Sequence, residues 1–335
     1  MFTKQILHKG VLVLVSLLAF SGLMSCSSDD DENGPNLEPP LYSSVSGRYE
    51  ITSPESSIRS VELTESGNYI IILNGAKYEA KQGSKARFLY LNKSFTRAIS
   101  FNNMIHGQFT KVSDTEFILE GWGRIVLSTD SNGGTTITYT PNGGQSFTYP
   151  YYMRKPISDS GLTNALCRTW SIESLRLTYK VGKDTFNEKY KMSELSKLKV
   201  DFLNFYKKIA RKYGADDEDI ADFEEDWNED FDELEYAVPN QVIFSKAGTY
   251  IVTYKGDSLA VSTWKWVDQN NKLIRYSWDY DDEYSYNVSG NVKIDFSGNQ
   301  LLLIETPTDR DNDYDEDYDD PIVTATLTWY MNEVR

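Results

Sequence analysis

The chain repeats one short pattern of residues in its two halves, and this repeat constrains the fold more than any other feature. Residues 61–71 read VELTESGNYII and residues 242–252 read VIFSKAGTYIV, with Val, Gly, Tyr and Ile at equal spacing. Two further pairs of matching segments follow in the same order: 112–119 with 296–303, and 151–155 with 329–333. All three pairs are separated by about 180 residues, which predicts two related domains in tandem.

The starts of the two copies also match, but at a shorter separation. Gly47–Ile51 (GRYEI) corresponds to Arg168–Ile172 (RTWSI). The second copy therefore carries about 60 extra residues between its first strand and the repeated pattern. We expect one domain over 43–156 and a second over 162–335.

Both domains have the pattern of short β-strands with tight turns. Asn132-Gly133-Gly134 and Asn142-Gly143-Gly144 are strong turn signals between alternating apolar stretches. Short strands rich in Tyr, Ile, Val and Thr predict an all-β barrel or sandwich. The fold class is therefore mainly β, with two antiparallel barrels or sandwiches.

The order of patterns in the second domain resembles the lipocalin-like domains of Bacteroidota lipoproteins. An aromatic first strand at Trp170 is followed by V-x-F-x-x-x-G-x-Y from Val242, then a W-x-W strand at Trp264 and a hairpin. The resemblance covers most of 165–335 and, more loosely, 45–155. It implies two lipocalin-like barrels.

The extra segment of the second domain, about 192–236, has the pattern of a helical hairpin. Apolar residues recur at helical spacing from Leu195 to Tyr213 and again from Ile220 to Leu234. One interpretation is that this hairpin packs on its own barrel as structure. The resemblance to lipocalins suggests the alternative, a lid over a pocket in which Phe202, Phe205 and Trp227 contact a ligand.

The first 25 residues have the features of a signal peptide. A basic start precedes the apolar run 11–20, which is too short to span a bilayer. The sequence LMSC ending at Cys26 resembles a bacterial lipobox, which implies a lipid-bearing Cys26. An ordinary signal peptide is the alternative.

Residues 26–42 form an acidic and proline-rich linker. Ser28, Asp29, Asp30 and Asp31 resemble the export tag of Bacteroidota surface lipoproteins, and a plain solvated linker is the alternative. The resemblance implies an outer-membrane protein that is lipid-anchored at the cell surface.

Composition excludes several function classes. The chain has 50 acidic and 34 basic residues, a net charge of −16, which argues against nucleic-acid binding. His106 is the only His after the leader, so multi-His metal sites are excluded and a catalytic base near neutral pH is disfavoured.

Cys167 has no second Cys to pair with once Cys26 is acylated. The sequence contains neither a Gly-x-Ser-x-Gly elbow nor a phosphate loop, and we predict no catalytic activity.

One acidic segment suggests a weak calcium site. Asp309, Asp311 and Asp313 alternate as calcium ligands do, but Tyr314 stands where such loops usually have Gly. A solvated acidic loop is the more economical interpretation, so we predict no cofactor beyond this weak site.

Aromatic residues supply the candidate ligand-binding positions. Trp264 and Trp266 share one face of a predicted strand, with Trp278 on its neighbour. Aromatic faces stack on sugars and line apolar pockets, although most strand aromatics pack cores. We expect a surface lipoprotein that binds a small apolar molecule or a glycan. A structural or adhesive module is the alternative, and a hydrolase with a carboxylate site is the third reading.

Overall fold

The computed structural model describes residues 35, 37–74, 104–236, 238–254, 259–277, 291–306 and 323–334. The chain divides into two compact units. The first unit comprises Glu32–Thr169 and Ile243–Ala260, and the second comprises Trp170–Val242 and Val261–Val334. Within the described residues, no helix has the length and apolar character needed to span a bilayer.

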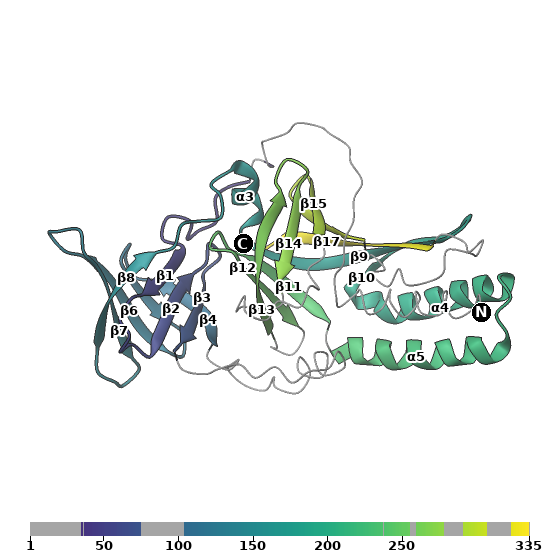
Figure 1. Ribbon diagram of the computed structural model, residues 1–335, viewed down its shortest axis with the longest axis horizontal. Coiled ribbons are helices and arrows are strands. Elements are labelled where there is room, and N and C mark those ends of the chain that lie inside the picture. Colours follow the sequence, from purple (N-terminus) through teal and green to yellow (C-terminus); the bar gives the residue numbers. More distant parts are fainter. Residues whose placement is uncertain are drawn as a thin grey trace. The chain divides into compact units, whose positions relative to one another are not determined.

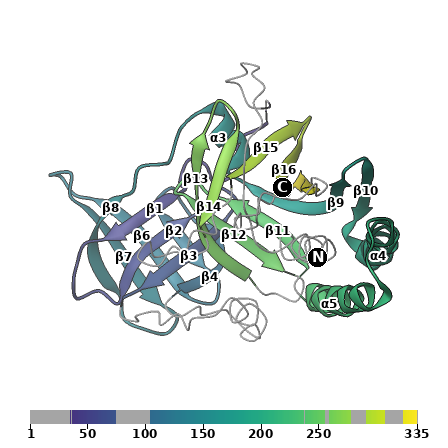
Figure 2. The same ribbon diagram turned by 45° about the vertical axis from the view of Figure 1, so that its right-hand side comes forward.

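The first barrel is a closed antiparallel sheet of eight strands in chain order (Figures 1 and 2). Pairing of Tyr49 with Met153 and of Ile51 with Tyr151 joins the first strand to the last and closes the ring. This is the up-and-down architecture of lipocalins. The strands are β1 (Gly47–Ile51), β2 (Ile58–Leu63), β3 (Asn68–Leu73), β4 (Met104–Lys111), β5 (Glu116–Leu119), β6 (Gly123–Thr129), β7 (Thr135–Pro141) and β8 (Phe147–Met153).

Alternation of apolar residues along these strands fills the interior of the first barrel. In β5, Phe117 and Leu119 are buried while Ile118 between them is exposed, as the two-residue period of a strand requires. Val45, which precedes β1, and buried residues from seven of the strands form one hydrophobic cluster; the strand residues are Tyr49, Ile58, Val61, Leu63, Tyr69, Ile71, Phe109, Phe117, Leu119, Ile125, Ile137 and Tyr139. The core of this barrel is thus made by its own side chains.

The second sheet has nine strands in the order β10-β9-β11-β12-β13-β14-β15-β16-β17, and β9 also pairs with β17. That extra pairing closes eight of the strands into a second antiparallel barrel and leaves β10 as a side strand. The strands are β9 (Thr169–Val181), β10 (Asp184–Lys191), β11 (Pro239–Phe244), β12 (Thr249–Tyr254), β13 (Leu259–Asp268), β14 (Leu273–Ser277), β15 (Asn291–Ser297), β16 (Gln300–Glu305) and β17 (Val323–Glu333). The predicted fold class, two lipocalin-like β barrels, is confirmed.

The repeated sequence pattern forms the same hairpin in both halves. Gly67 and Gly248 have φ values of 87° and 92°, a left-handed conformation that favours glycine. The Thr64 side chain accepts from the Asn68 N–H at 3.0 Å, and the Ser245 side chain accepts from the Thr249 N–H at 3.1 Å. In each copy, a hydroxyl side chain four positions before the second strand of the hairpin thus accepts a hydrogen bond from the first backbone N–H of that strand.

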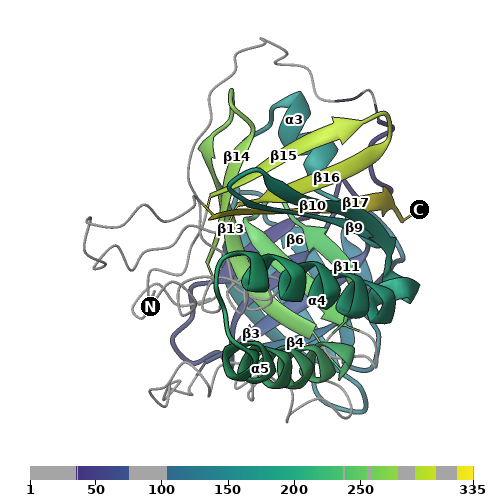
Figure 3. The same cartoon turned by 90° about the vertical axis from the view of Figure 1, so that its right-hand side faces the viewer.

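The inserted helical hairpin consists of α4 (Leu195–Lys212), preceded by the short helix η1 (Met192–Glu194), and α5 (Asp217–Tyr236). The two helices lie side by side (Figures 1 and 3). They bury their apolar stripes among aromatic rings. The rings of Tyr206 and Phe223 stack with centroids 3.6 Å apart, and Phe202 meets Tyr179 of β9 edge to face with centroids 5.3 Å apart. The insert therefore packs against the β9–β10 ribbon.

Candidate ligand pocket

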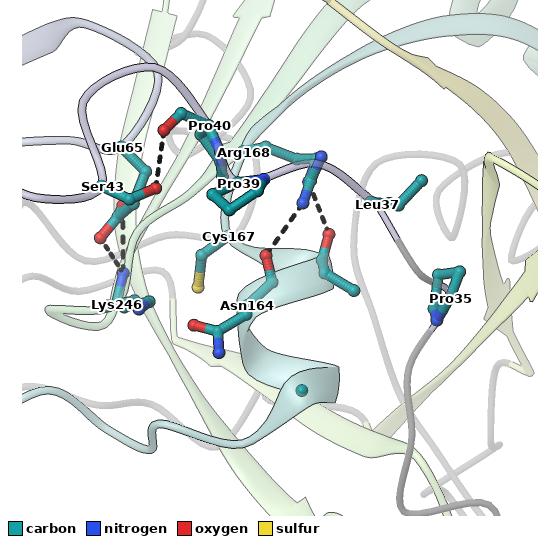
Figure 4. A pocket seen from close by; sticks show the side chains of 12 residues that line it. Pro35, Leu37, Pro39, Pro40, Ser43, Glu65, Asn164, Cys167, Arg168 and Lys246 are labelled. Atoms are coloured by element: carbon teal, nitrogen blue, oxygen red, sulfur yellow. Dashed lines mark hydrogen bonds between the residues drawn. The ribbon is translucent and has the colours of Figure 1, made fainter.

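A cavity of about 600 Å³ lies in the first unit, beside the short helix α3 (Gly161–Leu166). Part of its wall is a proline-rich segment that contributes Pro35, Leu37, Pro39, Pro40 and Ser43, and the opposite wall contains Glu65 and Lys246. In Figure 4, Glu65, Ser43 and Lys246 gather on one side, while Leu37 and Pro35 lie on the other. Ligand pockets commonly measure roughly 300–1,000 Å³, so the cavity has room for a small molecule.

Arg168 holds the proline-rich segment against α3. Its Nε donates to the Ala165 carbonyl at 2.8 Å and one Nη donates to the Asn164 carbonyl at 3.1 Å. The other Nη reaches the Glu38 carbonyl at 3.3 Å. A cation at the end of a helix satisfies carbonyls that have no partner within the helix. Because Arg168 also binds the segment, one side chain shapes two walls of the cavity.

Glu65 brings a buried carboxyl to the opposite wall. Only 2% of the residue is exposed, and Ser46 Oγ donates to its Oε1 at 2.9 Å. The Lys246 backbone N–H also donates to this carboxylate at 3.4 Å. Burial, reinforced by the nearby Glu62 charge, raises the pKa of Glu65 to about 7. The pocket thus contains a carboxyl that changes charge near neutral pH.

Glu62 lies behind this wall, on the same hairpin. Ser245 Oγ donates to its Oε1 and Thr249 Oγ1 donates to its Oε2, at 2.5 and 2.6 Å. Burial raises the pKa of Glu62, while these two hydroxyls and nearby arginines act in the opposite direction. Both carboxylate oxygens of Glu62 accept hydrogen bonds from protein hydroxyls, so we assign this residue a structural role.

Cys167 also lines the pocket, but its thiol is chemically inert. The residue is fully buried, and burial raises the pKa of its thiol well above the usual value. The thiolate is the reactive form of cysteine, so a raised pKa suppresses nucleophilic chemistry. His106 lies on β4 and does not line the pocket, and burial lowers its pKa to about 4.

The helical residues predicted to contact a ligand are buried in the helix packing. Phe202 and Trp227 have no exposed surface, and their rings lie 4.8 Å apart. The Trp227 indole donates to the Lys199 carbonyl at 3.1 Å. The ring of Phe205 lies against the ring of Phe186 of β10, with centroids 5.5 Å apart. A ligand role for these three residues stays a prediction.

The tryptophans of β13 lie on one face, as their spacing predicts. Trp264 is only 2% exposed, and Trp266 meets it edge to face at 5.7 Å. Since Trp264 is buried, this pair does not form an open aromatic platform. Trp278 lies outside the described residues.

Several other predicted sites also lie outside the described residues. They are the lipid-anchor residue Cys26, the export-tag residues Ser28, Asp29, Asp30 and Asp31, and the calcium candidates Asp309, Asp311 and Asp313. In the part of the chain that the structure describes, no three metal-ligating side chains come together.

The charged residues of the pocket were not predicted from the sequence, although the repeat places two of them at matching positions. Glu65 and Lys246 occupy the same position in the two repeats, VELTE and VIFSK, and carry opposite charges. They meet through the Lys246 backbone N–H, which donates to the Glu65 carboxylate at 3.4 Å, whereas the Lys246 ammonium lies 3.9 Å from an Asp159 carboxylate oxygen. No comparable signal marked Arg168, whose role depends on carbonyls of two separate segments.

Comparisons with known proteins add little to this geometry. No family model matches the chain, and no curated protein matches it. A solved structure that aligns with this chain is a DUF3598-family protein of unknown function from Nostoc punctiforme, with 9% identity and a TM-score of 0.16. The match covers 88% of this chain and 98% of that one. A score this low carries no argument about fold or function.

Proposed function

We propose that this protein is a non-catalytic binding lipoprotein of the outer membrane, tethered at the cell surface through Cys26, and that the pocket beside α3 binds a small sugar-like ligand. The observation that carries the ligand assignment is the mixed lining of the cavity. Pro35, Leu37, Pro39 and Pro40 supply apolar surface, and Glu65, Asn164, Arg168 and Lys246 supply polar groups.

Sugars match such a lining because they have apolar C–H faces and many hydroxyls. Glu65 accepts hydrogen bonds, Lys246 donates them, and the Asn164 amide does both. A wholly apolar ligand would cover these groups without pairing them, at a cost of about 1–3 kcal/mol each. A glycan is therefore favoured over an apolar molecule in this pocket.

The filled core of the first barrel also favours this site over the barrel interior. The hydrophobic cluster there already includes buried residues from opposite sides of the ring, such as Val61 of β2 and Ile125 of β6. The barrel then acts as a rigid scaffold that positions Glu65. The buried, protonated thiol of Cys167 supports a binding role without catalysis.

Two measurements test the proposal. A full-length Cys26→Ser chain, free of lipid, would be screened against a panel of mono- and disaccharides by calorimetry. Lys246→Met and Asn164→Ala should each weaken binding by about tenfold. Lys111→Met on β4, which removes the same charge outside the pocket, should leave affinity unchanged. Failure of every sugar to bind, or equal loss in the control, would overturn the ligand assignment.

The anchor is tested separately. The wild-type chain should incorporate radiolabelled palmitate and sediment with membranes, and Cys26→Ser should do neither. Protease added to intact cells should digest the wild-type protein if it faces outward. An unlabelled wild-type chain would contradict the lipid anchor.

One observation favours adhesion as a second candidate function. On β8, Phe147, Tyr152 and Met153 are 46%, 57% and 52% exposed. Exposed aromatic residues are typical of protein-binding surfaces. Replacing Phe147 and Tyr152 with Ser should reduce cell attachment without changing sugar binding, if the protein is an adhesin.

A further inference from the structure

One face of the second sheet is basic, although the chain as a whole is acidic. Along β9, Arg176, Thr178 and Lys180 alternate with buried residues, so they share the face that points away from the core. The register of β9 with β10 and β17 extends this face over three neighbouring strands. We call it the basic face, and its members are Arg176, Thr178, Lys180, Thr185, Asn187, Lys189, Lys191, Thr324, Thr326, Thr328 and Tyr330.

The helical insert leaves the basic face open because it packs on the opposite side of the same strands. Phe186 of β10 and Tyr179 of β9 are partners in register, and both rings contact Phe202 of α4. Their neighbours Thr185 and Lys180 therefore point the other way. All four basic side chains of the basic face are exposed.

The basic face has four cations and no acidic member, in a chain with 50 acidic and 34 basic residues. Acids at its borders are held by other groups. Asp184 pairs with Lys212 of α4, and Glu173 accepts hydrogen bonds from the side-chain amides of Gln300 and Asn332. Among the described residues, no salt bridge joins a cation of the basic face to an acid. The positive charge is therefore presented to solvent.

Tyr330 lies beside two of these cations. The Lys189 ammonium is 3.5 Å from the centroid of the Tyr330 ring, and the Arg176 guanidinium carbon is 5.7 Å from it. The Thr178 hydroxyl donates to the Asn187 side-chain carbonyl at 3.0 Å, which directs the N–H donors of this exposed amide elsewhere. The face thus combines cations with hydroxyl and amide groups.

We propose that the basic face is a docking surface for an acidic polysaccharide, a sugar polymer with sulfate or carboxylate groups along its chain. Lys191 lies opposite Ser174, and Lys180 is six residues farther along β9, a separation of about 20 Å at about 3.3 Å per residue. Charge spread over this length suits an extended polyanion better than one small anion. Arg176 suits sulfate or carboxylate because its guanidinium forms two parallel hydrogen bonds. The threonine and asparagine side chains suit sugar hydroxyls.

The charge of the whole chain favours a single polymer strand over broader anionic partners. An anionic bilayer is a wide surface, and contact with it brings the acidic remainder of a chain with net charge −16 into the same field. Two copies of the chain repel each other for the same reason. A polysaccharide strand contacts the basic face alone. This site goes beyond the α3 pocket, because the basic face belongs to the other unit.

Calorimetric titration of the lipid-free, full-length Cys26→Ser chain with dextran sulfate and with dextran tests the inference, because the two polymers share one backbone and differ in charge. We expect dextran sulfate to bind at least about tenfold more tightly than dextran, and less tightly as salt is added. Lys246→Met, in the α3 pocket, should leave this binding unchanged. Failure of the pocket to bind sugars is thereby separated from failure of the basic face.

The triple variant Arg176→Gln, Lys180→Gln, Lys189→Gln should weaken binding of dextran sulfate about tenfold, because three exposed ion pairs are lost. Lys180→Glu alone should weaken it about fivefold, and this single exposed change keeps the test valid if the triple variant folds poorly.

The matched control is the triple variant Lys155→Gln, Lys208→Gln, Arg211→Gln, which removes the same charge from exposed positions outside the basic face. It should retain wild-type affinity. Equal losses in the two triple variants would reduce the binding to nonspecific attraction and overturn the proposal. Equal binding of dextran, equally tight binding of glucose 6-sulfate, or tighter binding to phosphatidylglycerol vesicles would also overturn it. So would a dimer of the free chain that Lys180→Glu dissociates.

Discussion

Glu62 and Thr249 lie 187 residues apart in the chain, and the Thr249 hydroxyl donates a hydrogen bond of 2.6 Å to the Glu62 carboxylate. The Ser245 hydroxyl donates to the other carboxylate oxygen. Ser245 and Thr249 belong to one repeated hairpin, and Glu62 belongs to its counterpart. Within the first unit, the two copies of the repeat therefore meet around one buried carboxyl.

Thr249→Val should lower the free energy of unfolding by about 1–3 kcal/mol, because it leaves a buried Glu62 oxygen without its donor. Urea denaturation measures the change. Thr148→Val, at an exposed position of β8, is the control and should change stability by no more than about 0.5 kcal/mol. Equal effects of the two variants would contradict the buried hydrogen bond.

We predict that ionisation of Glu65 lowers the free energy of unfolding as pH rises from 4.5 to 7. Its pKa is about 7 in the folded protein against an ordinary value of 4.5, so the unfolded chain binds fewer protons in this interval. Stability is therefore highest below pH 4.5 with respect to this group, and it falls by on the order of 3 kcal/mol up to pH 7.

Urea denaturation across this pH range would compare wild type with Glu65→Gln. The amide does not titrate, so the difference in stability between the two proteins should change steadily from pH 4.5 through 7 and level off about one pH unit above the folded pKa. Glu55→Gln, at an exposed position, should follow the wild-type profile. A constant difference between wild type and Glu65→Gln would show that Glu65 ionises normally.

Trp227→Ala should lower the free energy of unfolding by about 3–5 kcal/mol, because it leaves a large cavity between α4 and α5. Trp227 has no exposed surface and contacts the rings of Phe202, Phe223 and Phe231. Val200→Ala, on the exposed face of α4, should have little effect. Thermal melting followed by circular dichroism at helical wavelengths measures both; similar melting temperatures for the two variants would contradict the helix packing.

Gly67→Ala and Gly133→Ala separate backbone strain from packing. The two glycines have similar φ values, 87° and 82°, so a side chain at either should cost about 1–2 kcal/mol. A Cβ at Gly67 would also lie 2.8 Å from a Tyr42 ring carbon, whereas one at Gly133 meets open space. Gly67→Ala should therefore be the more destabilising variant in chemical denaturation. The reverse order would mean that Tyr42 does not pack on this turn.

Much of the local structure could be predicted from residue order. The two-residue alternation of β5 and the turn at Gly67 depend only on neighbours in sequence. The helical insert followed from apolar spacing that ends at Gly214. Its use was less predictable, because the same apolar stripe suits a lid or a packing surface. In the described structure Phe202 packs against the rings of Tyr179 and Trp227, and a lid role for the insert stays a prediction.

The candidate pocket could not be predicted in the same way. Its lining combines a linker, a six-residue helix and two hairpin turns, and none of these has a sequence pattern of its own for binding. Glu305 of β16 was equally hidden among 50 acidic residues. It is distinguished by burial between Val292 and Leu327, its partners in register, and this burial is a property of the closed sheet.

By itself, the sequence determined the strand periodicity, the two copies of the hairpin and the helical insert, because each follows from interactions between residues a few positions apart. Only the tertiary structure decided that Glu62 meets Thr249 and that Arg168 holds the Glu38 carbonyl. Contacts between distant segments depend on how closed sheets bring them together, and burial in those contacts then sets the charge and the chemistry of each group.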